Sequence, residues 1–128
     1  MDNLAYLKFS LARDALDKDD EVSAITLLQE SLELNAHFKA YELLGHICLK
    51  QGDLVQARQY LEKAYALNER NNKTATLLAE TLSAQGDSIK AIRVLEEVLL
   101  RNKNYGPVQK LLEQLKEEHK RESEASDS

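Results

Sequence analysis

The sequence contains little of what disulfide-bonded, strand-rich or membrane-spanning proteins require. Its 128 residues include one cysteine, one proline, four glycines and no tryptophan. The single thiol, Cys48, excludes an intrachain disulfide and fits a reducing compartment. No apolar run approaches the roughly 18 residues that span a bilayer, and residues 1–8 lack a basic region followed by an apolar stretch, as a signal peptide would have. We therefore expect a cytoplasmic protein that does not bind membranes.

The charge balance narrows the partner classes. A formal net charge of −5 and a pI near 5.2 argue against a surface that follows phosphates, so we expect no nucleic-acid binding. The composition is 43% hydrophobic and 30% charged, which is too apolar for a disordered chain. Most residues are good helix formers such as Leu, Ala, Glu, Lys and Gln. The composition predicts one all-α domain.

A repeat of about 34 residues organises most of the chain. The segment Gln51-Gly52-Asp53 recurs as Gln85-Gly86-Asp87, at an offset of 34. The same offset pairs Leu44 with Leu78, Ala57 with Ala91 and Leu61 with Leu95, and an offset of 33 pairs them backwards with Leu11, Ala24 and Leu28. The sequence thus predicts three units, about residues 4–37, 38–71 and 72–105.

Each unit is predicted to contain two helices joined by a short turn. In the second unit, apolar residues recur at steps of three and four, both before Gly52 and after Asp53. Gly52 suits the left-handed residue that ends a helix, and Asp53 suits the N-cap of the next. The first unit has Asp19-Asp20 where the others have Gly-Asp. We expect its turn to be less regular, with Asp20 as the N-cap.

The pattern resembles the tetratricopeptide repeat (TPR), whose period is 34 residues. Leu44, Gly45, Ala57, Leu61 and Ala64 carry the resemblance, with counterparts in the other units. The units lack the family's usual terminal proline, and Ala15, Cys48 and Leu82 replace a frequent aromatic. The resemblance implies a right-handed α-solenoid of three helix-turn-helix units.

A further helix is predicted after the repeats, beginning near Pro107, which suits a first turn. Its apolar stripe on one side and polar residues on the other are typical of a helix that caps a stack. We expect a capping helix over about residues 107–120, a single domain over 1–115 and a disordered tail over 121–128.

We find no catalytic or metal-binding grouping in the sequence. His46 and Cys48 are two residues apart, so on a helix they point about 200° away from each other. Cys48 is expected to be a buried apolar residue. The three histidines have no spacing that places two on one helix face, and no glycine-rich phosphate loop occurs. We therefore expect a protein without catalytic activity, metal or cofactor.

The TPR resemblance implies that the first helix of each unit lines a concave groove that binds a peptide or protein segment. Groove candidates are residues of these helices outside the packing stripe. They are Tyr6, Phe9, Arg13 and Leu16 in the first unit, Lys39, Glu42, His46 and Lys50 in the second, and Lys73, Thr76, Glu80 and Ser83 in the third. The lysines could favour an acidic peptide, and Tyr6 and Phe9 an apolar anchor. Alternatively, the lysines form a solvated face and the aromatics cover the end of the first unit.

Many TPR proteins hold the C-terminal carboxylate of a chaperone tail with a five-residue clamp of Lys, Asn and Arg. The corresponding positions here are Phe9, Arg13, Leu43, Lys73 and Leu77, of which Lys73 alone matches. The resemblance therefore predicts binding that does not use this clamp.

Two other functions stay open at this point. One is a self-assembling scaffold, because the end that carries Tyr6 and Phe9 has no cap and permits weak self-association of an otherwise monomeric chain. The other is a regulatory or accessory subunit of an enzyme or chaperone complex, which also acts by binding.

Overall fold

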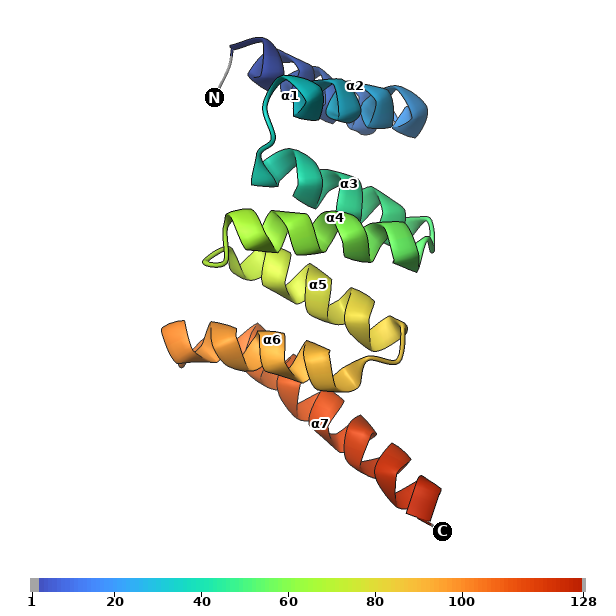
Figure 1. The fold of residues 1–128 in the computed structure, drawn as a ribbon, viewed down its shortest axis with the longest axis vertical. Helices are drawn as coiled ribbons and strands as arrows, with labels where there is room; N and C mark the ends of the chain where they lie inside the picture. Colours follow the sequence, from blue (N-terminus) through green and yellow to red (C-terminus); the bar gives the residue numbers. More distant parts are fainter. Residues whose placement is uncertain (1–2, 128) are drawn as a thin grey trace. The chain divides into compact units, whose positions relative to one another are not determined.

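The computed structural model describes residues 3–127 as seven helices joined by short turns (Figure 1). They are α1 (Asn3–Asp17), α2 (Glu21–Leu34), α3 (Phe38–Lys50), α4 (Leu54–Leu67), α5 (Asn72–Ala84), α6 (Ser88–Arg101) and α7 (Gly106–Asp127). Helices that are consecutive in the predicted units pack against each other as pairs. The predictions of an all-α fold and of seven helices are confirmed.

The helices form two compact units, Met1–Asn68 with α1 to α4 and Glu69–Ser128 with α5 to α7. The sequence predicts one domain over residues 1–115, whereas the boundary between these units lies in the turn between α4 and α5. It falls close to the predicted junction of the second and third repeats.

The turn within each helix pair has the same backbone geometry in all three repeats. Gly52 and Gly86 have φ values of 81° and 86°, and Asp19 adopts the same left-handed region with φ 59°. The next residue donates its N–H to a carbonyl five positions earlier: Asp20 to Ala15 at 2.8 Å, Asp53 to Cys48 at 2.9 Å and Asp87 to Leu82 at 2.8 Å. The prediction of a less regular first turn is wrong, because an aspartate tolerates the left-handed conformation better than most residues.

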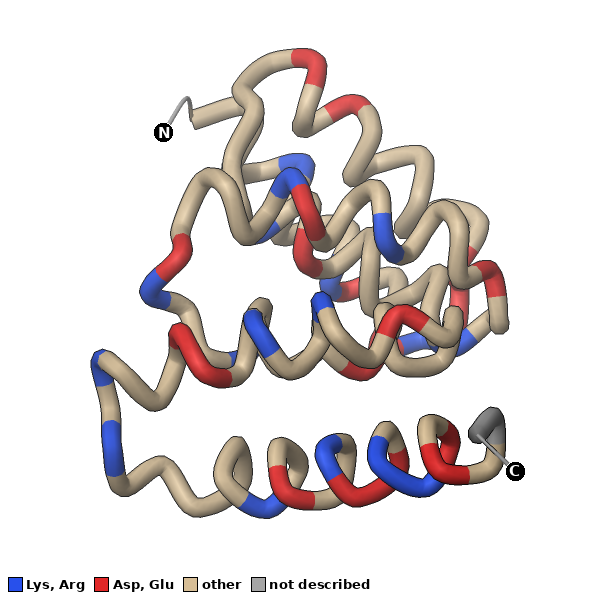
Figure 2. The backbone as a smooth tube through the Cα atoms, turned by 60° about the horizontal axis from the view of Figure 1, so that its bottom comes forward, with Lys and Arg blue, Asp and Glu red and all other residues tan. Residues whose placement is uncertain are grey.

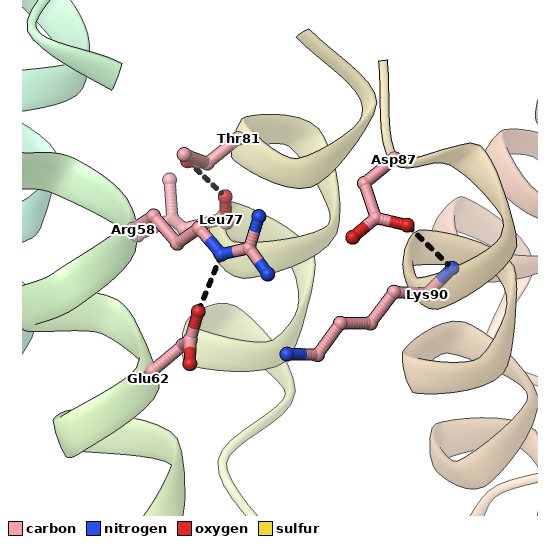
Figure 3. A network of polar contacts seen from close by, with 6 residues as sticks. All are labelled: Arg58, Glu62, Leu77, Thr81, Asp87 and Lys90. Atoms are coloured by element: carbon pink, nitrogen blue, oxygen red, sulfur yellow. Dashed lines mark hydrogen bonds and ion pairs between the residues drawn. The ribbon is translucent and has the colours of Figure 1, made fainter. Parts of the chain in front are cut away.

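The three aspartates that follow these turns are N-caps, as predicted. Asp20 accepts a hydrogen bond from the Ser23 N–H at 3.1 Å, and Asp53 accepts one from the Gln56 N–H at 3.2 Å. Asp87 caps α6 in the same way through the Lys90 N–H (Figure 3). Figure 3 also shows two further contacts within single helices, from Arg58 to Glu62 on α4 and from the Thr81 hydroxyl to the Leu77 carbonyl on α5.

The core of the first unit lies where α2 packs between α1 and α3. Each of the three helices contributes a buried alanine and at least one large residue, so that the helices approach closely at the alanines and the large side chains fill the adjoining space. They are Phe9, Ala12, Ala24, Leu28, Ala40, Leu44 and Ile47. The presence of Phe9 in this cluster corrects the sequence-based assignment of its side chain to an exposed groove.

In the second unit, α6 contacts both α5 and α7. Val108, Leu112 and Leu115 of α7 are buried, which agrees with the predicted capping stripe. The helix continues to Asp127, where the sequence predicts an end near residue 120 and a disordered tail; Ser128 lies outside the described residues. Acidic and basic residues are mixed along α7 (Figure 2), and the extension after residue 120 has Arg121 followed by acidic residues. Such residues favour helix, and no proline or glycine stops it.

Candidate functional site

A hollow of about 230 Å³ opens on the first unit between the end of α1, the turn after it, and α3. Its lining combines apolar and charged side chains from elements that are distant in sequence. They are Leu16, Asp19, Glu21, Leu43, His46, Ile47 and Lys50. A lining of three apolar, two acidic and two basic side chains suits a side chain of a peptide rather than a free anion.

The left-handed turn at Asp19 builds one side of this hollow. It ends α1 and reverses the chain, so that Glu21 begins α2 beside the last turn of α3. There, Gln51 donates from Nε2 to Glu21 Oε2 at 2.8 Å. This hydrogen bond joins the first residue of α2 to the C-cap residue of α3, which is 30 residues away in the sequence, and so fixes this side of the hollow.

Leu16, His46 and Lys50, three of the predicted groove residues of the first two repeats, line the hollow together. Tyr6 is 60% exposed, and Arg13 and Lys39 are also exposed, but they lie outside the lining. Glu42 is half-buried and lies outside it as well. Phe9 is only 8% exposed, so it cannot serve as an apolar anchor for a ligand.

The predicted groove residues of the third repeat belong to the second compact unit and are described there. Lys73 and Glu80 are exposed on α5. Thr76 is half-buried, and its hydroxyl donates to the Asn72 carbonyl at 2.8 Å within the helix. The hydroxyl proton is therefore already used in a hydrogen bond within its own helix.

Asp19, Glu21, Leu43 and Ile47 line the hollow but are not among the groove candidates from the sequence. Asp19 lies in a turn and Glu21 begins the second helix of its pair, whereas the expected groove is lined by first helices only. Leu43 and Ile47 belong to the packing stripe, whose edge remains accessible here. The Asp-Asp pair in place of Gly-Asp is the sequence signal that marks this turn as different.

A second hollow, of about 490 Å³, lies on the second unit and is lined by Arg70, Asn72, Arg101 and Asn102. Arg101 donates from Nη2 to the Glu69 carbonyl and so ties the turn before α5 to the end of α6. Arg70 and Arg101 are both exposed. The residues that line this hollow are all polar or charged, which distinguishes it from the first.

Ser31, which is buried, and His37, which is half-buried, form a structural contact in the first unit. The Ser31 hydroxyl donates to the Ala5 carbonyl at 2.7 Å, and its oxygen lies 3.2 Å from His37 Nε2. Because the hydroxyl proton is already used, Nε2 carries the imidazole proton and donates to Ser31. Burial lowers the pKa of His37, and the ring meets Phe9 edge-on, with centroids 5.6 Å apart. This cluster joins α1, α2 and the start of α3.

Cys48 is buried, as predicted, and burial raises the pKa of its thiol, with a smaller contribution from Asp53. A protonated thiol is a poor nucleophile. Within the described part of the chain, no group of three or more His, Cys, Asp or Glu side chains is placed to hold a metal ion. None of the helices in residues 3–127 combines the length and apolar character that a membrane crossing demands.

Comparison with solved structures shows the fold. The first TPR domain of Spaghetti (RPAP3), bound to an HSP90 peptide SRMEEVD, matches with a TM-score of 0.77 at 15% identity, over 98% of this chain and 97% of that one. The P58(IPK) TPR domain matches with a TM-score of 0.85 at 23% identity, over 96% of this chain but 34% of that one. The N-terminal domain of stress-induced protein-1 from C. elegans has a TM-score of 0.77 at 16% identity, over 91% and 99% of the two chains.

Among curated protein sequences, no significant match is found. A family model described as tetratricopeptide repeat matches residues 48–115, which is more than half of the chain. That segment begins in the last turn of α3 and ends in the buried stripe of α7, so it contains α4, α5 and α6 completely. With this match and the solved structures in agreement, the chain belongs to the tetratricopeptide repeat family.

Proposed function

We propose that the chain is a non-catalytic protein-interaction module that binds a peptide or an extended segment of a partner protein. The hollow between α1 and α3 takes an apolar side chain of this segment, and His46 and Lys50 contact an acidic group next to it. Tyr6, Arg13, Lys39 and Glu42 extend this surface on the first unit. Lys73, Thr76 and Glu80 remain proposed contacts on the second.

The composition of the hollow is the observation that carries this proposal. Three apolar side chains line it together with Asp19, Glu21, His46 and Lys50. A volume of about 230 Å³ exceeds that of one large side chain and falls short of a typical small-molecule pocket. The hollow therefore fits an anchor residue of a longer ligand, whose backbone continues over the surface.

The ligand of one structurally similar domain supports a peptide as the ligand class. The RPAP3 domain is bound to an HSP90 peptide, SRMEEVD, which contains two apolar residues and three acidic ones. For the present chain, four of the five clamp positions differ from the clamp residues, and Phe9 at the first of them is buried. We therefore propose that the ligand is an internal or acidic peptide segment, and that the hollow binds it without a carboxylate clamp.

The proposal is tested with a peptide-display library selected on the purified chain. Enriched peptides are synthesised, and their dissociation constants are measured by calorimetry. We expect His46→Ala/Lys50→Glu to weaken binding at least about tenfold, or roughly 1.4 kcal/mol. The control Lys110→Glu makes the same change in formal charge on the exposed side of α7 and should leave affinity within about twofold of wild type.

Equal affinity of wild type and His46→Ala/Lys50→Glu would remove the hollow from the proposal. Failure to enrich any peptide would contradict peptide binding itself. A role as an accessory subunit makes the same prediction, because it also requires a bound protein segment. The single buried thiol fits a reducing compartment, so a cytoplasmic location belongs to the same proposal.

A further inference from the structure

Basic residues gather at one end of the second unit, where α5 begins and α6 ends (Figure 1). Residues 69–73 and 101–104 contain four basic residues and a single acidic one, Glu69. The whole chain has 22 acidic and 17 basic residues, so the balance of charge is reversed at this place. The hollow of about 490 Å³ opens here, and we call it the arginine hollow. Its lining is Arg70, Asn72, Arg101 and Asn102.

A hydrogen bond brings the two arginines of the lining together. Arg101, the last residue of α6, donates from Nη2 to the Glu69 carbonyl, 32 residues away in the sequence. Because this carbonyl belongs to the peptide bond that leads into Arg70, the Arg101 guanidinium lies beside the backbone of the other arginine. The contact uses one of the five N–H donors of Arg101 and leaves the others for a ligand.

The side chains of the lining have donors that the protein does not use. Within residues 3–127, the Arg70 guanidinium and the side-chain amides of Asn72 and Asn102 make no hydrogen bond. In the same part of the chain, neither arginine of the lining forms an ion pair. The acidic neighbour, Glu69, is exposed and lies outside the lining. An anion in the hollow therefore interacts favourably with two positive charges and displaces no carboxylate.

The other repeats show that the fold does not require an arginine at position 101. Offsets of 34 and then 33 carry Arg101 back onto Leu67 and Leu34, which are 53% and 43% exposed. The helices that end in these leucines are followed by the same kind of C-cap, an asparagine. An offset of 34 also carries Lys103 onto Glu69, which has the opposite charge. The basic character is thus a property of this surface and not of the repeat.

We propose that the arginine hollow binds a phosphate group. A phosphate monoester has a charge of about −1.5 to −2 at pH 7 and three strong acceptor oxygens. Guanidinium groups bind such oxygens through two parallel hydrogen bonds, and the amides of Asn72 and Asn102 add neutral donors. A carboxylate has one charge and two oxygens, so it satisfies fewer of these donors. The lining, as far as the structure describes it, contains no aromatic side chain on which a nucleobase would stack.

The size of the hollow favours a phosphate group that is part of a larger ligand. A volume of about 490 Å³ falls in the range of sites that take whole small molecules. A phosphorylated side chain of a protein uses this space better than a free phosphate ion does. The arginine hollow belongs to the second unit, whereas the hollow between α1 and α3 belongs to the first. The inference therefore does not depend on the peptide binding proposed for the first unit.

An NMR titration of the full chain at pH 7.5 and constant ionic strength tests the proposal. The probes are phosphoserine and glutamate, each with both ends blocked, and inorganic phosphate. We expect blocked phosphoserine to shift the amide signals of residues 69–73 and 101–104, with a dissociation constant of about 1–5 mM. Blocked glutamate should bind at least about tenfold more weakly. Weaker binding of inorganic phosphate than of blocked phosphoserine supports a phosphorylated side chain as the source of the group, and equal binding supports the free ion.

Substitution of the arginines identifies the groups that bind. Arg70→Gln/Arg101→Gln removes both charges and should weaken the binding of blocked phosphoserine at least about tenfold. Arg70→Gln alone should weaken it about threefold, and it keeps the hydrogen bond from Arg101 to the Glu69 carbonyl, so this loss does not come from a loosened turn. The matched control, Arg93→Gln/Lys120→Gln, makes the same change in formal charge at exposed positions of α6 and α7 and should bind like the wild type.

Three results would overturn the proposal. The first is an affinity for blocked phosphoserine that is the same in Arg70→Gln/Arg101→Gln and in the wild type. The second is equal affinity of the wild type for blocked glutamate and blocked phosphoserine, because the hollow would then not distinguish a phosphate from a carboxylate. The third is a titration in which the shifts are spread over basic residues of the whole chain, or are absent. The amide spectrum of each variant shows at the same time whether it is folded.

Discussion

Gly45 of α3 faces Leu61 of α4 so closely that a Cβ atom at position 45 would lie 2.5 Å from Leu61 Cγ. Both residues are buried, and Leu61 is fully so. The equivalent positions of the other repeats, Ala12 and Ala79, carry a methyl group. The second helix pair is thus the one in which a leucine occupies the space of that methyl.

We expect Gly45→Ala to lower the free energy of unfolding by about 1–3 kcal/mol, because the added methyl overpacks the contact. Leu61→Ala alone should cost about 2–5 kcal/mol. Combined, the two substitutions should cost clearly less than their sum, since alanine at 61 leaves room for the methyl. Urea unfolding of the four proteins measures this coupling, and additive effects would contradict the close contact.

Gly52→Ala should destabilise the chain by about 1 kcal/mol although it meets no steric obstacle. No atom lies within 4 Å of an added Cβ at Gly52, but the residue has φ 81°. Gly106→Ala is the matched control, because its Cβ also meets open space and its φ is ordinary. Thermal unfolding of both variants distinguishes the cost of the left-handed backbone conformation from any steric effect of the added methyl group. An equal loss in the two would show that the left-handed turn is not the cause.

The stability of the first unit should fall as the pH decreases through about 6.5. Burial lowers the pKa of His37 below its ordinary value of 6.5, and Lys39 adds to the effect. Between the folded-state pKa and 6.5, the unfolded chain binds more protons, so acid favours unfolding, and the stabilisation is complete above 6.5. A proton on Nδ1 would also be buried, with no acceptor among the described residues.

Urea unfolding at pH 7.5 and 5.5 measures this effect, with His37→Gln as the comparison. The variant keeps a side-chain donor but does not titrate, so its stability should change less between the two pH values. If the wild type and the variant lose the same stability on acidification, other groups are responsible. Stability that increases toward pH 5.5 in the wild type would contradict the direction of the His37 shift.

Cys48 should react slowly with a disulfide reagent in the native protein. The thiol is buried and its pKa is raised, so both access and the thiolate fraction are low. We expect the rate to rise at least about tenfold in urea. In Cys48→Ala/Glu33→Cys, the thiol sits at an exposed position of α2 and should react quickly in both conditions. Equal native rates for the two thiols would contradict the burial of Cys48.

The sequence predicts the turns within the helix pairs well because each of them is marked by its residues. Gly52 and Gly86 adopt the left-handed conformation that their position requires, and Asp20, Asp53 and Asp87 cap the helices that follow. The end of α7 could not be predicted from apolar periodicity, because this signal stops at Leu115. The charged residues after it favour helix by propensity alone.

The candidate site was harder to predict, because periodicity assigns a residue to a helix face but not to the neighbour of that face. Phe9 shares the groove position with Glu42 and Thr76, yet it turns toward Ala12 and His37 and joins the core. A large aromatic gains more from burial than a carboxylate or hydroxyl does. The hollow itself depends on which turn lies beside α3, and the repeat pattern says nothing about this.

The three turns within the helix pairs share one backbone path, but their tips differ chemically. Gly52 and Gly86 present bare backbone, whereas Asp19 follows the same path and places a carboxylate at the mouth of the hollow. In a repeat architecture this is a local change of surface that leaves the scaffold as it is. The first turn therefore adds a negative charge to the lining of the hollow, on the scaffold that the other two turns share.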